Sequence, residues 1–334
     1  MPQITQNPNI GQRPPQAIPF NHVVDLLGSY ATPAVGRVFM VRGDGTNVSQ
    51  YDEQYNVNNS DANRMLYPSV EAALAKCIDD RGDTIIVLPK HTQNLGAATT
   101  SSWTFKKGVR IVGLGQGSSI PTFTLTTATS KLNLNAINVS ITGCRFLCAG
   151  PAGTTALTVT APFTMSAVGC SLIGNEFEVG IDNDQLCTTF LTVSAARCTF
   201  SYNVCESQAA AAALTAGIVI TAADKFTCEG NVMKAGFGSA ATGWIAAATT
   251  ASKDVLIRKN VIVQWTATST GGIDFSSALA CTGVIAENQL RTMDTAATGI
   301  VPITAHASSD LSLFNNYVCN EKATTGALDG TVSA

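Results

Sequence analysis

The chain has few charged residues for its length. Only 13% of its 334 residues are Asp, Glu, Lys or Arg, and the formal net charge is -3. It contains no basic run and no stripe of Lys or Arg interleaved with aromatic residues, the pattern of nucleic-acid-binding surfaces. No segment approaches the roughly 18 consecutive apolar residues that a membrane-spanning helix needs. We therefore expect neither nucleic acid nor membrane among the partners of this protein.

Residues typical of metal and catalytic sites are also scarce. The three histidines, His22, His91 and His306, lie far apart, and no Cys-x-x-Cys pair is present. We therefore expect no metal site and no cofactor. Several of the ten cysteines, Cys170 and Cys198 among them, stand where other segments of the chain carry apolar residues. This placement predicts free, buried thiols instead of a disulfide framework.

The amino terminus lacks the basic and apolar regions of a signal peptide, so we expect no secretory signal. Residues 1 to 35 are rich in Pro, Gln and Asn and hold few large apolar groups. This composition predicts an extended arm without a core of its own. Because such arms become ordered against a partner, we expect the arm to be the attachment segment. Its candidate partner-binding residues are Gln12, Arg13, Pro14, Pro15 and Phe20.

The second half of the chain is a repeat marked by asparagine. Six asparagines follow one another at intervals of 28, 28, 29, 28 and 28 residues, at Asn175, Asn203, Asn231, Asn260, Asn288 and Asn316. The residues five before, three before and two after each asparagine are almost wholly apolar, and those between are mostly polar or small. Such alternation is typical of strands with one buried face, so we expect these three columns to point inward.

A glycine recurs at a similar interval and predicts a Thr-Gly or similar turn that opens another strand in each period. These glycines are Gly217, Gly243, Gly272, Gly299 and Gly326. Less regular periods precede the repeat. In them Leu114 and Cys144 stand at the position that asparagine holds in the later periods. Together with the strand Asp83 to Leu88 they give about nine turns. One period of about 28 residues is one turn of a β-solenoid.

The Ile-x-x-Asn-x-apolar frame, over residues 83 to 334, resembles the right-handed parallel β-helix of the pectate-lyase-like superfamily. In that superfamily such asparagines form internal ladders, which their amide donors and acceptors allow. The predicted fold is therefore all-β, a single-stranded right-handed parallel β-helix with an asparagine ladder. The fold does not determine the activity, because it hosts lyases, hydrolases, adhesins and structural proteins.

Residues 36 to 82 are expected to form an N-terminal cap region. A short helix at about 69 to 79 is predicted there, because Ser69 is a good N-cap and Val70, Leu74 and Ile78 follow at helical spacing. We expect this helix to cover the open N-terminal end of the β-helix. Such an entry cap resembles those of phage and bacterial β-helix proteins.

Carbohydrate cleavage is the best-known activity of the superfamily, and it needs two carboxylates about 5–9.5 Å apart. On a solenoid these would be acids of one outward column on adjacent turns. Glu176, Glu206 and Glu229 fall at different offsets from their asparagines, which predicts no aligned pair. Asp182 and Asp184 form the best acidic pair, in a loop. The polygalacturonase-type motifs Asn-Thr-Asp, Gly-His-Gly and Arg-Ile-Lys are absent.

Two classes of function remain. The first is a structural bacteriophage virion protein without enzymatic activity, made in the host cytoplasm and located on the outer capsid surface. As a capsid decoration or cement protein it would bind the major capsid protein or another virion protein through its arm, and by analogy would form a homotrimer. The alternative is a tailspike-type polysaccharide depolymerase or receptor-binding protein, with Asp182, Asp184 and Glu206 as its candidate catalytic residues.

Overall fold

A computed structural model of the chain describes most of the predicted solenoid. The described residues are 36–42, 66–98, 100–148, 157–178, 185–207, 214–236, 243–248, 250–264, 272–277, 280–292, 303–305 and 307–320. All of them belong to the compact unit Gly36–Ala334. The expected arm, residues 1 to 35 with its five partner-binding candidates, lies outside the described residues.

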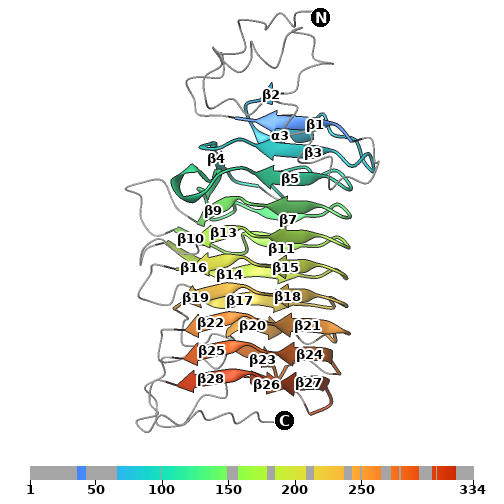
Figure 1. Ribbon diagram of the computed structural model, residues 1–334, viewed down its shortest axis with the longest axis vertical. Helices are drawn as coiled ribbons and strands as arrows, with labels where there is room; N and C mark the ends of the chain where they lie inside the picture. The colour runs from blue at the N-terminus through green and yellow to red at the C-terminus, as the bar shows by residue number, and fades with distance from the viewer. Residues whose placement is uncertain are drawn as a thin grey trace, which may run out of the picture. The chain divides into compact units, whose positions relative to one another are not determined.

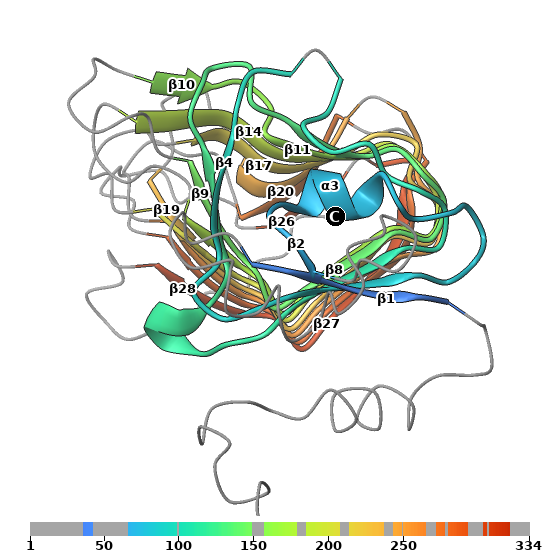
Figure 2. The same cartoon turned by 90° about the horizontal axis from the view of Figure 1, so that it is seen from above.

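The chain winds into a right-handed parallel β-solenoid with about 28 residues per turn, which confirms the predicted fold class (Figure 1). A full turn contributes one strand to each of three parallel sheets, stacked along the solenoid axis. Viewed along that axis, the sheets enclose the core (Figure 2). No helix in the described part of the chain is long and apolar enough to cross a membrane.

Three sheets make up the walls of the solenoid. Sheet 1 contains β2 (Leu66–Tyr67), β1 (Val38–Val41), β3 (Thr84–Val87), β5 (Arg110–Gly113), β8 (Ser140–Thr142), β12 (Ser171–Ile173), β15 (Thr199–Ser201), β18 (Thr227–Glu229), β21 (Val255–Arg258), β24 (Thr282–Ala286) and β27 (Asp310–Phe314). Sheet 2 contains β4 (Thr92–Leu95), β6 (Thr122–Leu125), β9 (Arg145–Cys148), β13 (Glu176–Glu178), β16 (Val204–Glu206), β19 (Val232–Ala235), β22 (Val261–Gln264), β25 (Gln289–Thr292) and β28 (Tyr317–Asn320). Sheet 3 contains β7 (Leu132–Leu134), β10 (Leu157–Val159), β11 (Phe163–Met165), β14 (Gln185–Val193), β17 (Leu214–Ile220), β20 (Gly243–Ala247), β23 (Ile273–Phe275) and β26 (Ile303–Ala305).

Seven turns of the described chain have strands in all three sheets, from β5–β7 to β24–β26. A turn with described strands in sheets 1 and 2 alone lies at each end, formed by β3 with β4 and by β27 with β28. The expected nine turns therefore correspond to seven full turns and two partial ones.

The three apolar columns of the repeat face the interior, as predicted. In sheet 1, Leu172, Phe200, Cys228, Ile257 and Ile285 face one another in register and are all fully buried. In sheet 2 the corresponding column contains three stacked phenylalanines. The ring centroids of Phe123 and Phe146 lie 5.5 Å apart, and those of Phe146 and Phe177 lie 5.3 Å apart. Burial of these rings supplies a large part of the hydrophobic stabilisation.

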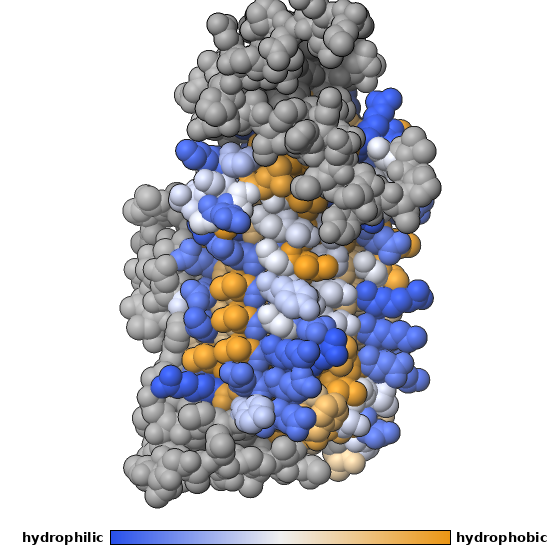
Figure 3. All heavy atoms as spheres, in the orientation of Figure 1, coloured by the Kyte–Doolittle hydropathy of each residue, from blue (hydrophilic) through white to orange (hydrophobic). Residues whose placement is uncertain are grey.

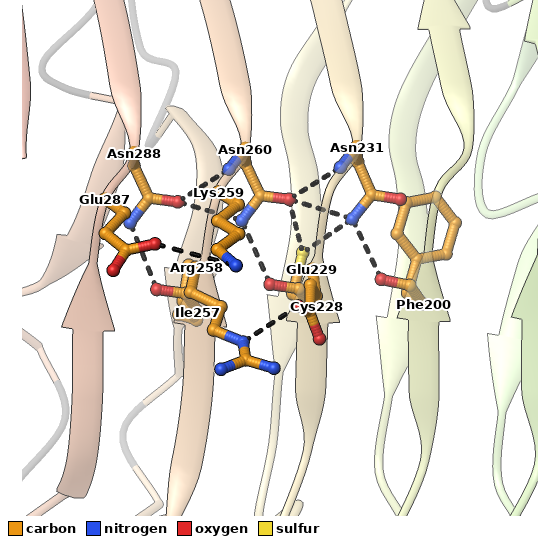
Figure 4. A network of polar contacts seen from close by, with 10 residues as sticks. All are labelled: Phe200, Cys228, Glu229, Asn231, Ile257, Arg258, Lys259, Asn260, Glu287 and Asn288. Carbon is orange, nitrogen blue, oxygen red and sulfur yellow. Dashed lines mark hydrogen bonds and ion pairs between the residues drawn. The ribbon is translucent and has the colours of Figure 1, made fainter.

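The six asparagines form a continuous ladder with a single polarity, and Figure 4 shows Asn231, Asn260 and Asn288 from its middle. The Oδ1 atom of Asn260 accepts bonds from the backbone N–H of Asn231 at 3.0 Å and from its Nδ2 at 2.9 Å. The Nδ2 atom of Asn260 donates in turn to Asn288 Oδ1 and to the Cys228 carbonyl. The same pattern recurs from Asn175 to Asn316. Each interior amide therefore satisfies buried backbone groups of the neighbouring turns.

The residue before each ladder asparagine adopts the left-handed helical conformation, which makes the bend between sheets 1 and 2. The φ angles are 62° at Gly174, 57° at Tyr202, 68° at Gly230, 56° at Lys259, 57° at Glu287 and 53° at Asn315. Glycine and asparagine tolerate this region best. The position before the asparagine accepts larger residues such as Tyr202 and Lys259 as well, because the asparagine ladder holds the backbone on one side of the bend.

Helix α3 (Val70–Leu74) lies over the first turns, where Figure 2 shows it inside the outline of the sheets. The Ser69 hydroxyl accepts a bond from the Ala72 N–H, so Ser69 is the N-cap, the residue that the sequence indicates. The helix ends at Leu74, earlier than the expected span to residue 79, and Ile78 is 54% exposed. Its apolar side is fully buried.

A buried carboxylate joins the cap region to the first strands. The carboxylate of Asp83 pairs in bidentate fashion with Arg81, with the Oδ1 atom 2.6 Å from Arg81 Nε and the Oδ2 atom 2.7 Å from Nη2. It also accepts bonds from the backbone N–H groups of Arg37 and Ile78. Burial alone would raise the pKa of Asp83, but these bonds outweigh it and hold the pKa below its ordinary value.

The recurrent glycines are not aligned as the sequence suggested. Gly243 faces Ala216 in the register of sheet 3, so Gly217 faces Trp244 instead. Gly217 lies inside β17, not in a turn before it. A Cβ atom at Gly217 would come within 2.4 Å of the Trp244 carbonyl oxygen and 2.6 Å of its ring. The absent side chain therefore makes room for a buried tryptophan.

Candidate functional site

The outward positions of the sheets form columns that follow the solenoid axis. Figure 3 shows apolar columns of this kind beside hydrophilic ones on one face. The position directly after the asparagine is valine in three consecutive turns, and it faces outward on sheet 2, where Val204 is 38% exposed. The position three residues after the asparagine also faces outward and carries Glu178, Glu206 and Lys234 in successive turns.

Ion pairs within single outward columns join neighbouring turns. Four of the five ion pairs described link positions on adjacent turns. On sheet 2 these are Arg145 with Glu176 and Lys234 with Glu206, and on the other side of the bend they are Arg258 with Glu229 and Lys259 with Glu287 (Figure 4). Such exposed pairs contribute about 0–1 kcal/mol each.

Glu178 and Glu206 are an exception to this alternation of charge. They face each other in the register of β13 and β16, on the outward side of sheet 2. Neighbouring strands lie about 4.8 Å apart, so two like charges stand on adjacent turns. The expectation that no acids align on adjacent turns was therefore wrong. Both glutamates lie three residues after a ladder asparagine, so counting from Asn175 as well as from Asn203 would have found the pair.

The acidic pair lies in a hollow of about 550 Å³ on the surface of sheet 2. Its lining consists of Arg145, Glu176, Phe177, Glu178, Val204, Glu206 and Ser207. Arg145 donates from its Nε atom to Glu176 at 2.7 Å, and Lys234 donates to Glu206 at 2.9 Å. The lining therefore offers three carboxylates, one cation at Arg145 and the apolar residues Phe177 and Val204, and Lys234 reaches Glu206 from the next turn. These groups match a hydroxyl-rich or cationic ligand.

The predicted catalytic residues are only partly accounted for. Glu206 lies in the hollow, whereas Asp182 and Asp184 lie outside the described residues, in the segment between β13 and β14. Glu178, which the sequence argument missed, takes the place beside Glu206. Glu229 is on the far side of the bend, paired with Arg258.

Nine cysteines belong to the described part of the chain, and all nine are free and buried, as predicted. Burial raises the pKa of Cys144 and Cys170 to about 12, so these thiols are protonated at neutral pH. They act as weak donors in the core, where Cys170 Sγ lies 3.2 Å from the Ala136 carbonyl. Within the described ranges, no group of three or more His, Cys, Asp or Glu residues could hold a metal ion.

A second internal ladder was not predicted. The Ala223 N–H donates to Ser252 Oγ, the Ser252 N–H donates to Cys281 Sγ, and the Cys281 N–H donates to Ser309 Oγ. These residues follow one another at 29, 29 and 28 residues, at the turn between sheets 3 and 1. Because the ladder mixes alanine, serine and cysteine, no single residue type marks it in the sequence.

The chain was compared with protein families, with curated proteins and with solved structures. No protein-family model, no curated protein and no solved structure matches it. The fold therefore stands on the structure itself, and the function is argued from the residues on its surface.

Proposed function

We propose that this protein is a structural component of a bacteriophage particle and that it acts as a capsid decoration or cement protein. The observation that carries the proposal is the continuity of the solenoid. Backbone ladders connect each turn to the next, and from Cys144 onward the asparagine ladder and four ion pairs add further bonds between neighbouring turns. A body cross-linked in this way resists local opening. Resistance to opening suits a protein that remains assembled outside the cell.

The proposed attachment is through the arm, residues 1 to 35, with Gln12, Arg13, Pro14, Pro15 and Phe20 as contacts. The proposed partner is the major capsid protein or another virion protein. A homotrimer remains the proposed oligomer, and light scattering of the purified protein would test it. The proposed location is the outer capsid surface.

Quantitative mass spectrometry of purified particles tests the role directly. The measurement is the copy number of this protein relative to the major shell protein. Copies in the hundreds are expected for a decoration protein, whereas a few to a few tens would place the protein on the tail and contradict the proposal.

Deletion of residues 1 to 35 tests the attachment. We expect the truncated protein to keep its circular dichroism spectrum and to lose co-sedimentation with capsids. The matched control is Glu287→Gln, which alters an exposed ion pair of the solenoid and should bind like the unaltered protein. Undiminished binding of the truncated protein would refute attachment through the arm.

A second candidate function is cleavage or binding of a polysaccharide, as in a tailspike-type depolymerase or receptor-binding protein. Glu178 and Glu206 favour it, because they share one outward column on adjacent turns inside the hollow. The spacing of their strands, about 4.8 Å, is close to the roughly 5–5.5 Å between the carboxyl groups of retaining glycosidases.

Turnover of host polysaccharide by purified protein distinguishes the two functions. If the second candidate is right, Glu178→Gln and Glu206→Gln should each abolish cleavage, and Glu287→Gln should not. Asp182→Asn tests the pair that the sequence suggested. Absence of cleavage and of glycan binding in the unaltered protein would leave the structural role alone.

A further inference from the structure

A buried histidine links the cap region to the first turn. His91 is fully buried in the turn before β4, and its Nε2 atom lies 3.1 Å from Gln93 Oε1. The same Oε1 atom accepts a bond from the backbone N–H of Val70, the first residue of α3. The amide nitrogen of Gln93 donates to the carboxylate of Glu71. Because that nitrogen is engaged, the amide oxygen faces His91, and Nε2 is the ring nitrogen that carries the proton.

Gln93 is therefore the connection between helix and solenoid. It stands in β4 at the inward position that faces Phe123 in the next turn. Two of its three bonds described above go to α3, and the third goes to His91. Helix α3 packs on the first strands of sheet 1 and buries Val70, Ala73 and Leu74. Its position depends on this apolar contact together with the two bonds from Gln93.

The surroundings of His91 favour the neutral imidazole. Its ring centroid lies 5.5 Å from that of Phe123, and burial lowers the pKa of His91. The charged residues next to it in these contacts are Glu71 on α3 and Lys90 in its own turn. Glu71 is separated from the imidazole by the Gln93 amide, and Lys90 is exposed. Neither contacts the ring in a described bond.

We propose that His91, Gln93 and Glu71 form a pH-sensitive latch, which holds α3 on the solenoid at neutral pH and releases it on acidification. A second proton on the ring would place a cation in a fully buried site beside Phe123. Hydration of that cation requires the turn at His91 to open. Opening withdraws the Gln93 oxygen from the Val70 N–H, and α3 loses its polar attachment.

The sign of the effect follows from linkage. Since the folded state holds His91 neutral, it binds fewer protons than the unfolded state. The stabilisation is complete above about pH 6.5, the ordinary value for histidine, and is lost progressively as the pH falls below it. The pKa of Asp83, the buried carboxylate of the cap, is lowered, so Asp83 takes up a proton in the folded state only below its ordinary value of 3.8. The two effects therefore occupy separate pH ranges.

Hydrogen exchange of the full-length protein tests the latch. We expect the amides of Val70, Ala73 and Ala75 to lose protection between pH 6.5 and 5, after correction for the intrinsic pH dependence of exchange. The expected loss of protection is about tenfold for each unit by which burial lowers the pKa of His91. Amides of the ladder, such as that of Asn231, should keep their protection over the same range.

Two variants complete the test. His91→Gln keeps a donor toward Gln93 but does not titrate, so it should abolish the pH dependence at Val70. His306→Gln is the matched control and should leave the pH dependence intact. Equal pH dependence in His91→Gln and the unaltered protein would overturn the proposal. So would unchanged protection of α3 down to pH 5, or a simultaneous loss at Asn231.

Discussion

At the scale of single residues, the side-chain amide of asparagine is the group on which the bend between sheets 1 and 2 depends. In mid-ladder, Asn231 Nδ2 donates to Asn260 Oδ1 and to the Phe200 carbonyl, and Asn231 Oδ1 accepts two bonds from Asn203. No other side chain of similar size supplies two donors and one oxygen with two lone pairs. Replacement by an apolar residue leaves several buried groups unsatisfied at once.

The first prediction concerns the hydrogen bonds of Asn231. Asn231→Ala should lower the free energy of unfolding by about 1–3 kcal/mol, because buried donors on Asn203 lose their acceptor. Asn316→Ala is the matched control at the end of the ladder, where the side chain is partly exposed and water can replace the lost bonds. Its loss should be smaller. Urea unfolding of both variants measures the difference, and equal losses would argue against the importance of burial in the ladder.

At the scale of elements, the packing of β17 against β20 depends on a glycine. Gly217 faces Trp244, whose fully buried ring fills the corner between sheets 2 and 3 and lies 6.4 Å from the ring of Phe190. The Trp244 Nε1 atom donates to the Val263 carbonyl at 3.4 Å. The ring therefore connects β20 to β22. It leaves no room for a side chain at Gly217 in the neighbouring strand.

The second prediction concerns this contact. Gly217→Ala should destabilise the protein by about 1–3 kcal/mol, because the new Cβ atom would meet the backbone of Trp244, which cannot move without disturbing the sheet. Gly96→Ala is the control, since no heavy atom lies within 4 Å of the added carbon. Its effect should stay within about 0.5 kcal/mol. Thermal melts of the two variants side by side are sufficient to separate them.

The cap region gives a third prediction, at acidic pH. The pKa of Asp83 is lowered in the folded state. Its pairing with Arg81 therefore stabilises the protein when the pH is above 3.8, the ordinary pKa of the carboxyl group, and this stabilisation is lost as the pH falls further. Asp83→Asn should remove this acid sensitivity and cost on the order of 3 kcal/mol at neutral pH, because the carboxylate is fully buried. Glu287→Gln, which breaks an exposed pair, should cost about 0–1 kcal/mol. Unfolding free energies at pH 7 and pH 3 provide both comparisons.

At the scale of the whole molecule, the solenoid is a stack in which each turn contacts its neighbours. Inward residues keep the same offset from the asparagine in the turns from Asn175 onward, and the strands of these turns pair without a shift in sheets 1 and 2. The stability of such a stack is close to a sum of the contributions of its turns and their interfaces. One turn is therefore removable without loss of the fold.

The fourth prediction is a deletion of one turn. Removal of residues 232–260, the turn that contains Trp244, joins Asn231 to Val261, which stands at the same position of the repeat as Val232. The shortened protein should fold, with a β-sheet circular dichroism spectrum and a single cooperative transition. Removal of residues 204–217 eliminates half a turn and should prevent folding, because the following strands would enter the wrong sheets. A folded half-turn variant would contradict the nearest-neighbour description.

The sequence by itself determined the solenoid, its period, the inward columns and the asparagine ladder, because each of these repeats within one turn and leaves a local pattern. It also contained the acidic pair at Glu178 and Glu206, which the same counting reveals.

The tertiary structure alone decided three other features: the register of Gly217 against Trp244, the mixed ladder through Ser252 and Cys281, and the contact of His91 with the cap. The register in sheet 3 follows segments of unequal length, and the mixed ladder combines different residue types. The histidine contact joins a helix, a turn and a strand only once. Contacts that do not repeat leave no period in the sequence, and they form only when the chain closes in three dimensions.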